Sequence, residues 1–420
     1  MAYYDNIYAR EIEISVYSSG NEIMRLTNEN VVSETLNFEE SICDGNFKFG
    51  GCIAGKFEID LLNITPNMIA DKRIIVIITE KYYDDTALYP QDTLSPSDDI
   101  YPGMYKTLLR KWTMFSGTVD TVKRQKDKQV THIVAYDKLY TVGRTNYYGL
   151  ISSIAQYSPT ADTTAVAEAL LENARTIYGL SYDLPNDRLG YYNYGMDLSM
   201  TDYAVAKDVF NGEITLSGAL QNLCEMTACF GRCRYYLGDG SDPNRGDFSY
   251  IRLGTTEKQI TAYKDLDYED YTIFPFNAID CKYNKNTWYH TENSSNTPST
   301  YTVGDNTILQ ACASETTAAQ VASGIKAALT VTGGVSGGKY QYRPFNCTIN
   351  NPDIVLGDKV SITTGDNYVP KVESYVLKRR ITGLIGMLIT ISAEGDQSQA
   401  ANNFSATSTA SALSAESESD

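Results

Sequence analysis

Histidine is nearly absent from this sequence, with only two residues, His132 and His290, among 420. So few imidazoles disfavour His-rich metal sites and weaken any catalytic triad built on Ser-His or Cys-His pairs. No apolar run approaches the roughly 18 residues that a membrane helix needs. The start, MAYYDNIYAR, lacks the basic and apolar regions of a secretory signal. We therefore expect a chain made in a cytosol, with no membrane span.

Positive charge is also scarce, because 35 Lys and Arg stand against 52 Asp and Glu, a formal net charge of −17. Proteins that bind the phosphate backbone of nucleic acids need Lys and Arg to displace counterions. The balance therefore argues against nucleic-acid binding. Tyrosine, in contrast, is abundant at 33 residues, and its ring suits β-sheets and large interfaces.

Eight cysteines are few for a chain of this length, and without an export signal they predict reduced, half-buried thiols. The stretch LNFEESICDGNFKFGGCIAGKFEIDLLNI (residues 36–64) raises three readings of Cys43 and Cys52, nine residues apart. They could be half of a zinc site, half of a disulfide, or part of a turn. Asp44-Gly45 is a strong tight-turn dipeptide, and no His or third Cys lies nearby. We therefore predict a hairpin, with Phe47 and Phe49 in its second strand and small buried thiols.

A second group, Cys224, Cys229 and Cys233, invites a metal reading. Cys224 and Cys229 are five residues apart and so point to different faces of a helix. Cys233 lies beyond the predicted helix end, and no fourth ligand is in view. We predict no metal site and no cofactor here.

Hydrophobic periodicity gives the expected elements. Period-two alternation in EIEISVY and KFEIDL predicts half-buried strands, while the continuous run RIIVII (residues 73–78) predicts a strand covered on both faces. Strands are also expected over 114–122 and 130–136, joined by the charged turn KRQKDK. Helical spacing predicts helices over 162–179, 215–231 and 314–330, the second ending at Gly231.

The predicted fold class is α+β, mostly β, because β-rich ends flank a helix-containing middle. A chain of 420 residues exceeds one compact core, so several domains are expected. We expect two tube-like β-barrel domains around that middle. The predicted divisions are 1–145 (N-terminal β-barrel), 146–237 (helix-containing), 238–339 (mixed β and helix), 340–396 (closing β-barrel segment) and 397–420 (low-complexity Ser/Ala/acidic tail).

Three apparent catalytic or binding motifs do not fit their structural context. GGVSGGKY resembles a phosphate loop, but Tyr340 stands where Ser or Thr would bind magnesium. The same run contains G-x-S-x-G around Ser336, yet both histidines precede it, whereas that type of hydrolase places its His afterwards. The acids of LGDGSDPNRGD fail the calcium-loop spacing. We therefore assign no catalytic residue.

Three segments together resemble the tail hub (baseplate hub) proteins of tailed bacteriophages. FSGTVDTVKRQKDKQVTHIVAYDKLY matches a strand with Phe-x-Gly-x-Val and a following strand that ends in Tyr-Asp. TLSGALQNLCEMTACFGRCRYY is similar to the family's helix that stops at a Gly and runs into a strand. The region from Tyr342 to Gly395 resembles its closing barrel, with a Gly-Asp turn. The matching positions are Phe115, Gly117, Val119, Tyr136, Asp137, Gly231, Gly357 and Asp358.

The resemblance implies a homotrimer in the virion, at the tail tip. Each subunit would supply two similar barrels, so three subunits would adapt a sixfold tail tube to a threefold tip. The implied partners are tail-tube and distal-tail or baseplate proteins and tail-tip spike or fibre proteins. Genomic DNA would pass through the lumen without specific binding, since three copies carry −51 formal charges, three times −17. In such hubs the 36–64 stretch is a hairpin that approaches the tube wall.

Two alternatives to this structural, non-enzymatic role stay open. The first is a tail-associated cell-wall hydrolase, because carboxylates are plentiful enough for an acid pair. Many hub relatives continue after the closing barrel into a fibre or a hydrolase, which this sequence lacks, so no lytic activity is assigned. The second is a receptor-binding adhesin that uses the Tyr-rich region 182–301 as a carbohydrate surface.

Overall fold

The structure is a computed structural model. It describes residues 6–43, 47–88, 105–125, 127, 129–143, 161–162, 197–198, 216–234, 247–254, 256–269, 278–291, 300–311, 315–330 and 342–394. The α+β, mostly β fold predicted from the sequence is confirmed.

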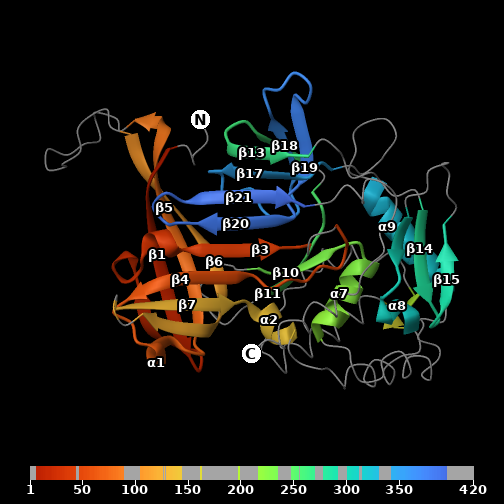
Figure 1. Cartoon of the computed structure of the whole chain (residues 1–420), viewed down its shortest axis with the longest axis horizontal. Coiled ribbons are helices and arrows are strands. Elements are labelled where there is room, and N and C mark those ends of the chain that lie inside the picture. The colour runs from red at the N-terminus through yellow and green to blue at the C-terminus, as the bar shows by residue number, and fades with distance from the viewer. Residues whose placement is uncertain are drawn as a thin grey trace.

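Strands from both ends of the chain form one eleven-stranded sheet, in the order β13-β17-β21-β20-β3-β4-β7-β6-β5-β1-β2. Figure 1 shows the red and orange N-terminal strands beside the blue C-terminal ones. The strands are β1 (Ile7–Ser18), β2 (Asn21–Leu26), β3 (Asn37–Ser41), β4 (Lys56–Leu62), β5 (Arg73–Leu88), β6 (Tyr105–Gln125), β7 (Val130–Tyr136), β13 (Lys264–Tyr268), β17 (Phe345–Ile349), β20 (Lys378–Thr382) and β21 (Leu388–Ala393).

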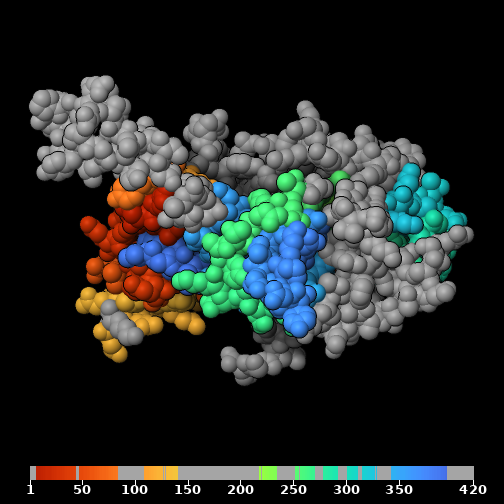
Figure 2. All heavy atoms as spheres, turned by 90° about the horizontal axis from the view of Figure 1, so that it is seen from above, coloured from red at the N-terminus to blue at the C-terminus, as the bar shows by residue number. Residues whose placement is uncertain are grey.

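The two ends join where β20 pairs antiparallel with β3, from Lys378 opposite Ser41 to Thr382 opposite Asn37. Figure 2 shows the N-terminal and C-terminal surfaces adjoining at this side of the molecule. Within the described residues the sheet ends at β13 and β2 without a ladder between them. The pairing therefore does not confirm two separate closed barrels, and the predicted domain boundaries stay predictions.

The alternating strands form as expected, because one face of the sheet is buried. In β4, Phe57, Ile59 and Leu61 are buried while the charged residues between them are partly exposed. The continuous apolar run at the start of β5 behaves differently from the prediction. Its Ile74 is buried but Ile75 is only partly buried, so this strand is covered on one face and not on both.

Smaller sheets and helices lie mostly to one side of the large sheet, and α9 packs against β14 (Figure 1). The sheets pair β10 (Phe230–Arg234) with β11 (Asp247–Ile251), β12 (Glu257–Ile260) with β18 (Lys359–Thr363) and β19 (Lys371–Tyr375), β14 (Ala278–Tyr283) with β15 (Thr287–His290) and β16 (Thr300–Val303), and β8 (Ala161–Asp162) with β9 (Asp197–Leu198). The helices are α1 (Pro66–Ile69), α2 (Lys138–Gly143), α7 (Leu216–Met226), α8 (Thr307–Ala311) and α9 (Glu315–Thr330).

Two local predictions are wrong in detail. The second strand of the 36–64 hairpin is β4, since Phe38 pairs with Phe57, and Phe47 and Phe49 lie outside any strand. The helix predicted over 215–231 ends earlier, at Met226, and Gly231 lies inside β10. It ends there because β10 needs the following residues extended to pair with β11.

Several sequence predictions fall outside the described residues. They are the Asp44-Gly45 turn, the helix over 162–179 apart from Asp162 in β8, the run GGVSGG, most of the LGDGSDPNRGD loop and the tail 397–420. Among the described helices, none combines the length and the apolar character that a bilayer-spanning segment requires.

Candidate functional site

The segment between β3 and β4 connects the large sheet to the helical side of the molecule. We call residues 47–55 the joint segment. Gly50 N–H donates to Cys229 O at 2.8 Å, and Gly231 N–H donates to Gly51 O at 2.8 Å. A parallel bridge pairs Cys52 with Gly231. The joint segment therefore runs beside the start of β10 and is held to it by backbone hydrogen bonds.

The glycine pair in the joint segment allows this close approach. A Cβ on Gly50 would lie 2.7 Å from Gln221 O, and one on Gly51 would lie 1.9 Å from Ile42 O. Both neighbours are backbone atoms and cannot turn aside as a flexible side chain would. The glycine pair therefore lets the joint segment pass between helix α7 and Ile42, the residue that directly follows β3.

Aromatic side chains fill the interior around the joint segment. Phe47 and Phe49 meet edge to face with ring centroids 5.1 Å apart, and Phe49 lies 5.4 Å from Phe230. The Phe49 N–H donates to the Tyr301 hydroxyl at 3.0 Å. Burial raises the pKa of the Tyr301 phenol well above its ordinary value. The hydroxyl therefore stays neutral and serves as a buried hydrogen-bond partner.

A buried polar cluster ties the joint segment to helices α7 and α8. The Glu225 side chain accepts a hydrogen bond from Asn306 Nδ2 at 3.0 Å. Lys48 Nζ forms an ion pair with Glu225 Oε1 at 3.2 Å. Asn306 also caps α8, accepting from Leu309 N–H at 3.0 Å, and donates to Asn222 O at 2.7 Å. One carboxylate and one amide thus hold three segments together.

Burial raises the pKa of the Glu225 carboxyl, while the Lys48 ammonium and the Asn306 amide act in the opposite direction. The group is only 3% exposed. Removing a charge from water is costly unless it is paired. The net direction shows that the two partners do not fully offset this cost.

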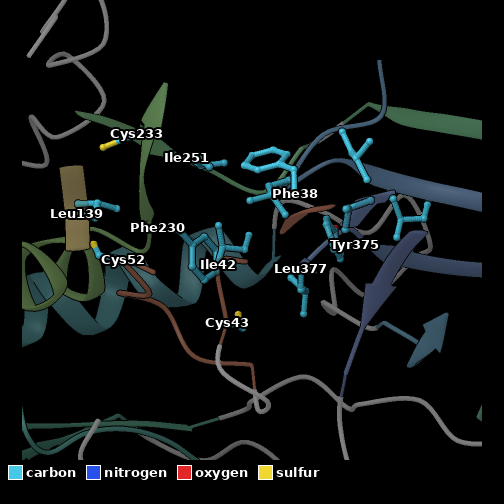
Figure 3. Close-up of a cluster of buried hydrophobic side chains, with 14 of the residues drawn as sticks. Phe38, Ile42, Cys43, Cys52, Leu139, Phe230, Cys233, Ile251, Tyr375 and Leu377 are labelled. Carbon is cyan, nitrogen blue, oxygen red and sulfur yellow. The ribbon is translucent and has the colours of Figure 1, made fainter. Parts of the chain in front are cut away.

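Cys52 has a third cysteine, Cys224, as its neighbour. Cys52 Sγ lies 3.7 Å from Cys224 Sγ of α7, and both thiols are buried. Cys43 lies before the joint segment in the chain, with its sulfur apart from that of Cys52 (Figure 3). No disulfide is present among the described cysteines. Within the described residues, no group of three or more His, Cys, Asp or Glu could hold a metal ion.

The positions of the predicted Phe-x-Gly-x-Val strand and Tyr-Asp end lie together in the large sheet. Phe115 is buried and stacks on Phe57, with ring centroids 5.3 Å apart. Val119 is buried opposite Ala135 of β7. Next to them, Gly117 allows β6 to pass the end of β7. These residues hold the strands in register.

Asp137, directly after β7, fixes the last residue of the joint segment, Gly55. Its Oδ2 accepts from Gly55 N–H at 2.7 Å and its Oδ1 from Leu139 N–H at 2.8 Å. The second bond caps the first turn of α2. Its neighbour Tyr136 stacks on Tyr140 of α2 with centroids 4.0 Å apart. Asp137 therefore holds the joint segment at Gly55, and Gly231 holds it at Gly51 and Cys52.

The Gly357-Asp358 turn lies at a different crossing. Gly357 has φ +84°, and its N–H donates to Val376 O at 2.8 Å. Asp358 Oδ2 accepts from Val355 N–H and from Lys258 Nζ, each at 2.7 Å. This turn, which precedes β18, therefore contacts Lys258 of β12 and the link between β19 and β20. The predicted motif positions therefore lie where separate segments of the chain pack closely. Two of them, Asp137 and Gly231, contact the joint segment.

The comparisons with known proteins show likeness in structure only. No protein-family model matches the chain, and no curated protein sequence matches it. The chain is similar to the 43 kDa tail protein of prophage MuSo2 from Shewanella oneidensis, with TM-score 0.46, 11% identity, and 91% of this chain and 98% of that one covered. It is also similar to the tail protein from Neisseria meningitidis MC58, with TM-score 0.44, 11% identity, and 94% and 100% covered. A third is prophage tail protein gp18 from Listeria monocytogenes EGD-e, with TM-score 0.44, 8% identity, and 93% and 97% covered. These structural neighbours are phage tail proteins.

The polar residues of the joint were not singled out from the sequence. Asn306 precedes Thr307 and an apolar stretch, which is an N-cap pattern that a search for short helices could have found. Glu225 stands between apolar residues of a predicted helix, and that position alone signals a buried carboxylate. The contact between Cys52 and Cys224 carries no sequence signal, because 172 positions separate them.

Proposed function

We propose that this chain is a structural component of a phage tail and, within the tail, the trimeric hub at the tip or baseplate. The observation that carries the proposal is the pairing of β20 with β3, which joins both β-rich ends in one sheet. In a trimer, two β units fixed to each other in each subunit would give six units around an axis. A sixfold tube could then rest on a threefold body.

The charge pattern supports the inference that DNA passes without binding. On one face of the sheet, Arg380 lies 3.1 Å from Glu39 and Lys56 lies 2.5 Å from Glu58. Where the excess of acid in the chain faces a lumen, it would repel the DNA backbone.

The partners in this proposal are those of an adaptor protein at the tip of the virion. Tail-tube and distal-tail or baseplate proteins would bind one side of the ring, and spike or fibre proteins the other. The chain would act by shape and charge, with no enzymatic step. Obligate assemblies of this kind bury about 2,000–5,000 Å² per interface.

The test is the mass of the full chain in solution by light scattering, followed by cryo-electron microscopy. We expect three times the monomer mass of 46.6 kDa and a threefold ring with a central channel. A monomer at high micromolar concentration, or a closed dimer, would contradict the hub. A zymogram on host peptidoglycan separates the hub from the hydrolase alternative, and we expect no clearing.

A further inference from the structure

Two thiols from distant parts of the chain face each other at the joint. Cys52 belongs to the joint segment and Cys224 to α7, and their sulfur atoms are 3.7 Å apart. That separation is a van der Waals contact, so bond formation needs an approach of about 1.7 Å to reach the disulfide length of about 2.05 Å. A change of side-chain rotamer together with a small backbone adjustment supplies a movement of this size.

The neighbouring thiols have other partners, which makes the contact selective. Cys229 Sγ lies 3.2 Å from Thr227 O, and Cys43 Sγ lies 3.9 Å from Lys48 O. Cys52 and Cys224, in contrast, contact each other sulfur to sulfur. The backbone also holds the pair in place, since Cys229 N–H donates to Cys224 O at 2.8 Å while Cys52 is bridged to Gly231.

We propose that Cys52 and Cys224 are an oxidisable pair whose disulfide staples the joint segment to helix α7. The link would connect the large sheet to the helical side at the point where they already touch. This inference does not depend on the proposed role in a phage tail. It concerns a modification of the folded chain that any oxidising disulfide reagent can bring about.

The order of the reaction follows from exposure. Cys52 is 6% exposed and Cys224 is 0% exposed, so the reagent reaches Cys52 first. With oxidised glutathione, the Cys52 thiolate attacks one glutathione sulfur and expels one glutathione thiolate. The Cys224 thiolate then attacks the Cys52 sulfur and expels the second. Two cysteine thiols are oxidised, one glutathione disulfide is reduced to two thiols, and the two cysteine protons pass to the departing thiolates.

Burial determines the rate of this reaction. It raises the pKa of the Cys224 thiol well above its ordinary value, so the thiolate is scarce in the closed joint. The reaction should therefore be slow in the native protein. The reaction should accelerate when low concentrations of urea increase local unfolding around the joint segment.

The experiment treats the full-length reduced chain with oxidised glutathione, with and without low urea, followed by removal of the reagent. We expect the intact mass to fall by two hydrogen atoms, and a proteolytic map to show one cross-linked pair of peptides that contains Cys52 and Cys224. We also expect the thermal midpoint of the oxidised protein to rise by about 4–8 °C, because the link closes a long loop.

The control variant is Cys43→Ala, which removes a buried thiol shortly before the joint segment and should still form the link. Cys52→Ala and Cys224→Ala should each abolish it. Unmodified wild-type protein after oxidation in low urea would overturn the proposal. So would a link that maps to another pair, such as Cys43 with Cys52 or Cys224 with Cys229. Because peptide mapping uses the wild type, the result does not depend on the folding of any variant.

Discussion

Gly117 lies where β6 passes the end of β7, and a methyl group has no room there. A Cβ at this position would lie 2.2 Å from Tyr136 O and 2.4 Å from Phe115 Cζ. The first of these is a backbone atom within a hydrogen-bonded ladder. At the scale of single residues, position 117 therefore requires glycine, because any side chain would collide with the backbone of β7.

Gly117→Ala should therefore lower the free energy of unfolding by about 3 kcal/mol, because neither strand can move without breaking its pairing. Urea denaturation measures the loss. Gly324→Ala in α9 is the matched control, since a Cβ there meets nothing within 4 Å. It should be neutral or stabilise by up to about 1 kcal/mol, as Ala favours helix over Gly. Equal effects of the two substitutions would refute the crowding argument.

Glu225 gives a prediction about pH. Its raised pKa means that the folded protein holds this proton more tightly than the unfolded chain does. The stability from this group is present in full below the ordinary pKa of 4.5 and is lost as pH rises through the folded value.

The variant Glu225→Gln cannot titrate but keeps an oxygen acceptor for Asn306. The free energy of unfolding of the wild type, minus that of the variant, should therefore increase as pH falls from 7 toward 5. Chemical denaturation at several pH values measures this difference, in which the other carboxylates cancel. A difference that is flat or decreases on acidification would show that the carboxyl is not held in a costly charged state.

At the scale of elements, helix α7 shows what the sequence predicts and what it does not. Its apolar spacing predicts the helix, and Leu220 and Leu223 are buried as expected. Its end was predicted at Gly231 because glycine usually takes the left-handed position after a helix. Here Ala228 takes it, with φ +53°, and Cys229 N–H closes the turn onto Cys224 O. The fixed position of β10 overrides the local preference for glycine.

The Asp137 carboxylate links two elements. It caps the first turn of α2 and also accepts a hydrogen bond from Gly55 of the joint segment. Asp137→Ala leaves two backbone N–H groups without this acceptor, which should cost about 2–4 kcal/mol. Hydrogen exchange should show reduced protection of α2 and of the Gly55 amide. Asp267→Ala, at an exposed position of edge strand β13, should change stability by less than about 0.5 kcal/mol. Unchanged protection in α2 would contradict the capping role.

At the scale of the whole molecule, strands were easier to predict than their partners. One buried face imposes period two on a strand, so β1, β4 and β7 can be recognised locally. The pairing of β20 with β3 cannot be recognised in this way, because nothing local identifies a partner. Arg379 and Glu40, which form an ion pair across it at 3.1 Å, are 339 positions apart. The predicted domain boundary at residue 340 therefore marks a change in the sequence pattern. The eleven-stranded sheet, however, contains strands from both sides of that boundary.

This sheet predicts that the two ends of the chain unfold together. Ile381 of β20 is buried opposite Phe38 of β3, so Ile381→Ala should cost about 2–5 kcal/mol. Native-state hydrogen exchange should show equal losses of protection in β3 and β20, since neither strand keeps its ladder alone. Ile279→Ala in β14 removes a similar buried side chain from a separate sheet and should spare β3. If Ile381→Ala weakened only the C-terminal strands, the two ends would be independent units, and the rigid coupling on which the proposed ring depends would be lost.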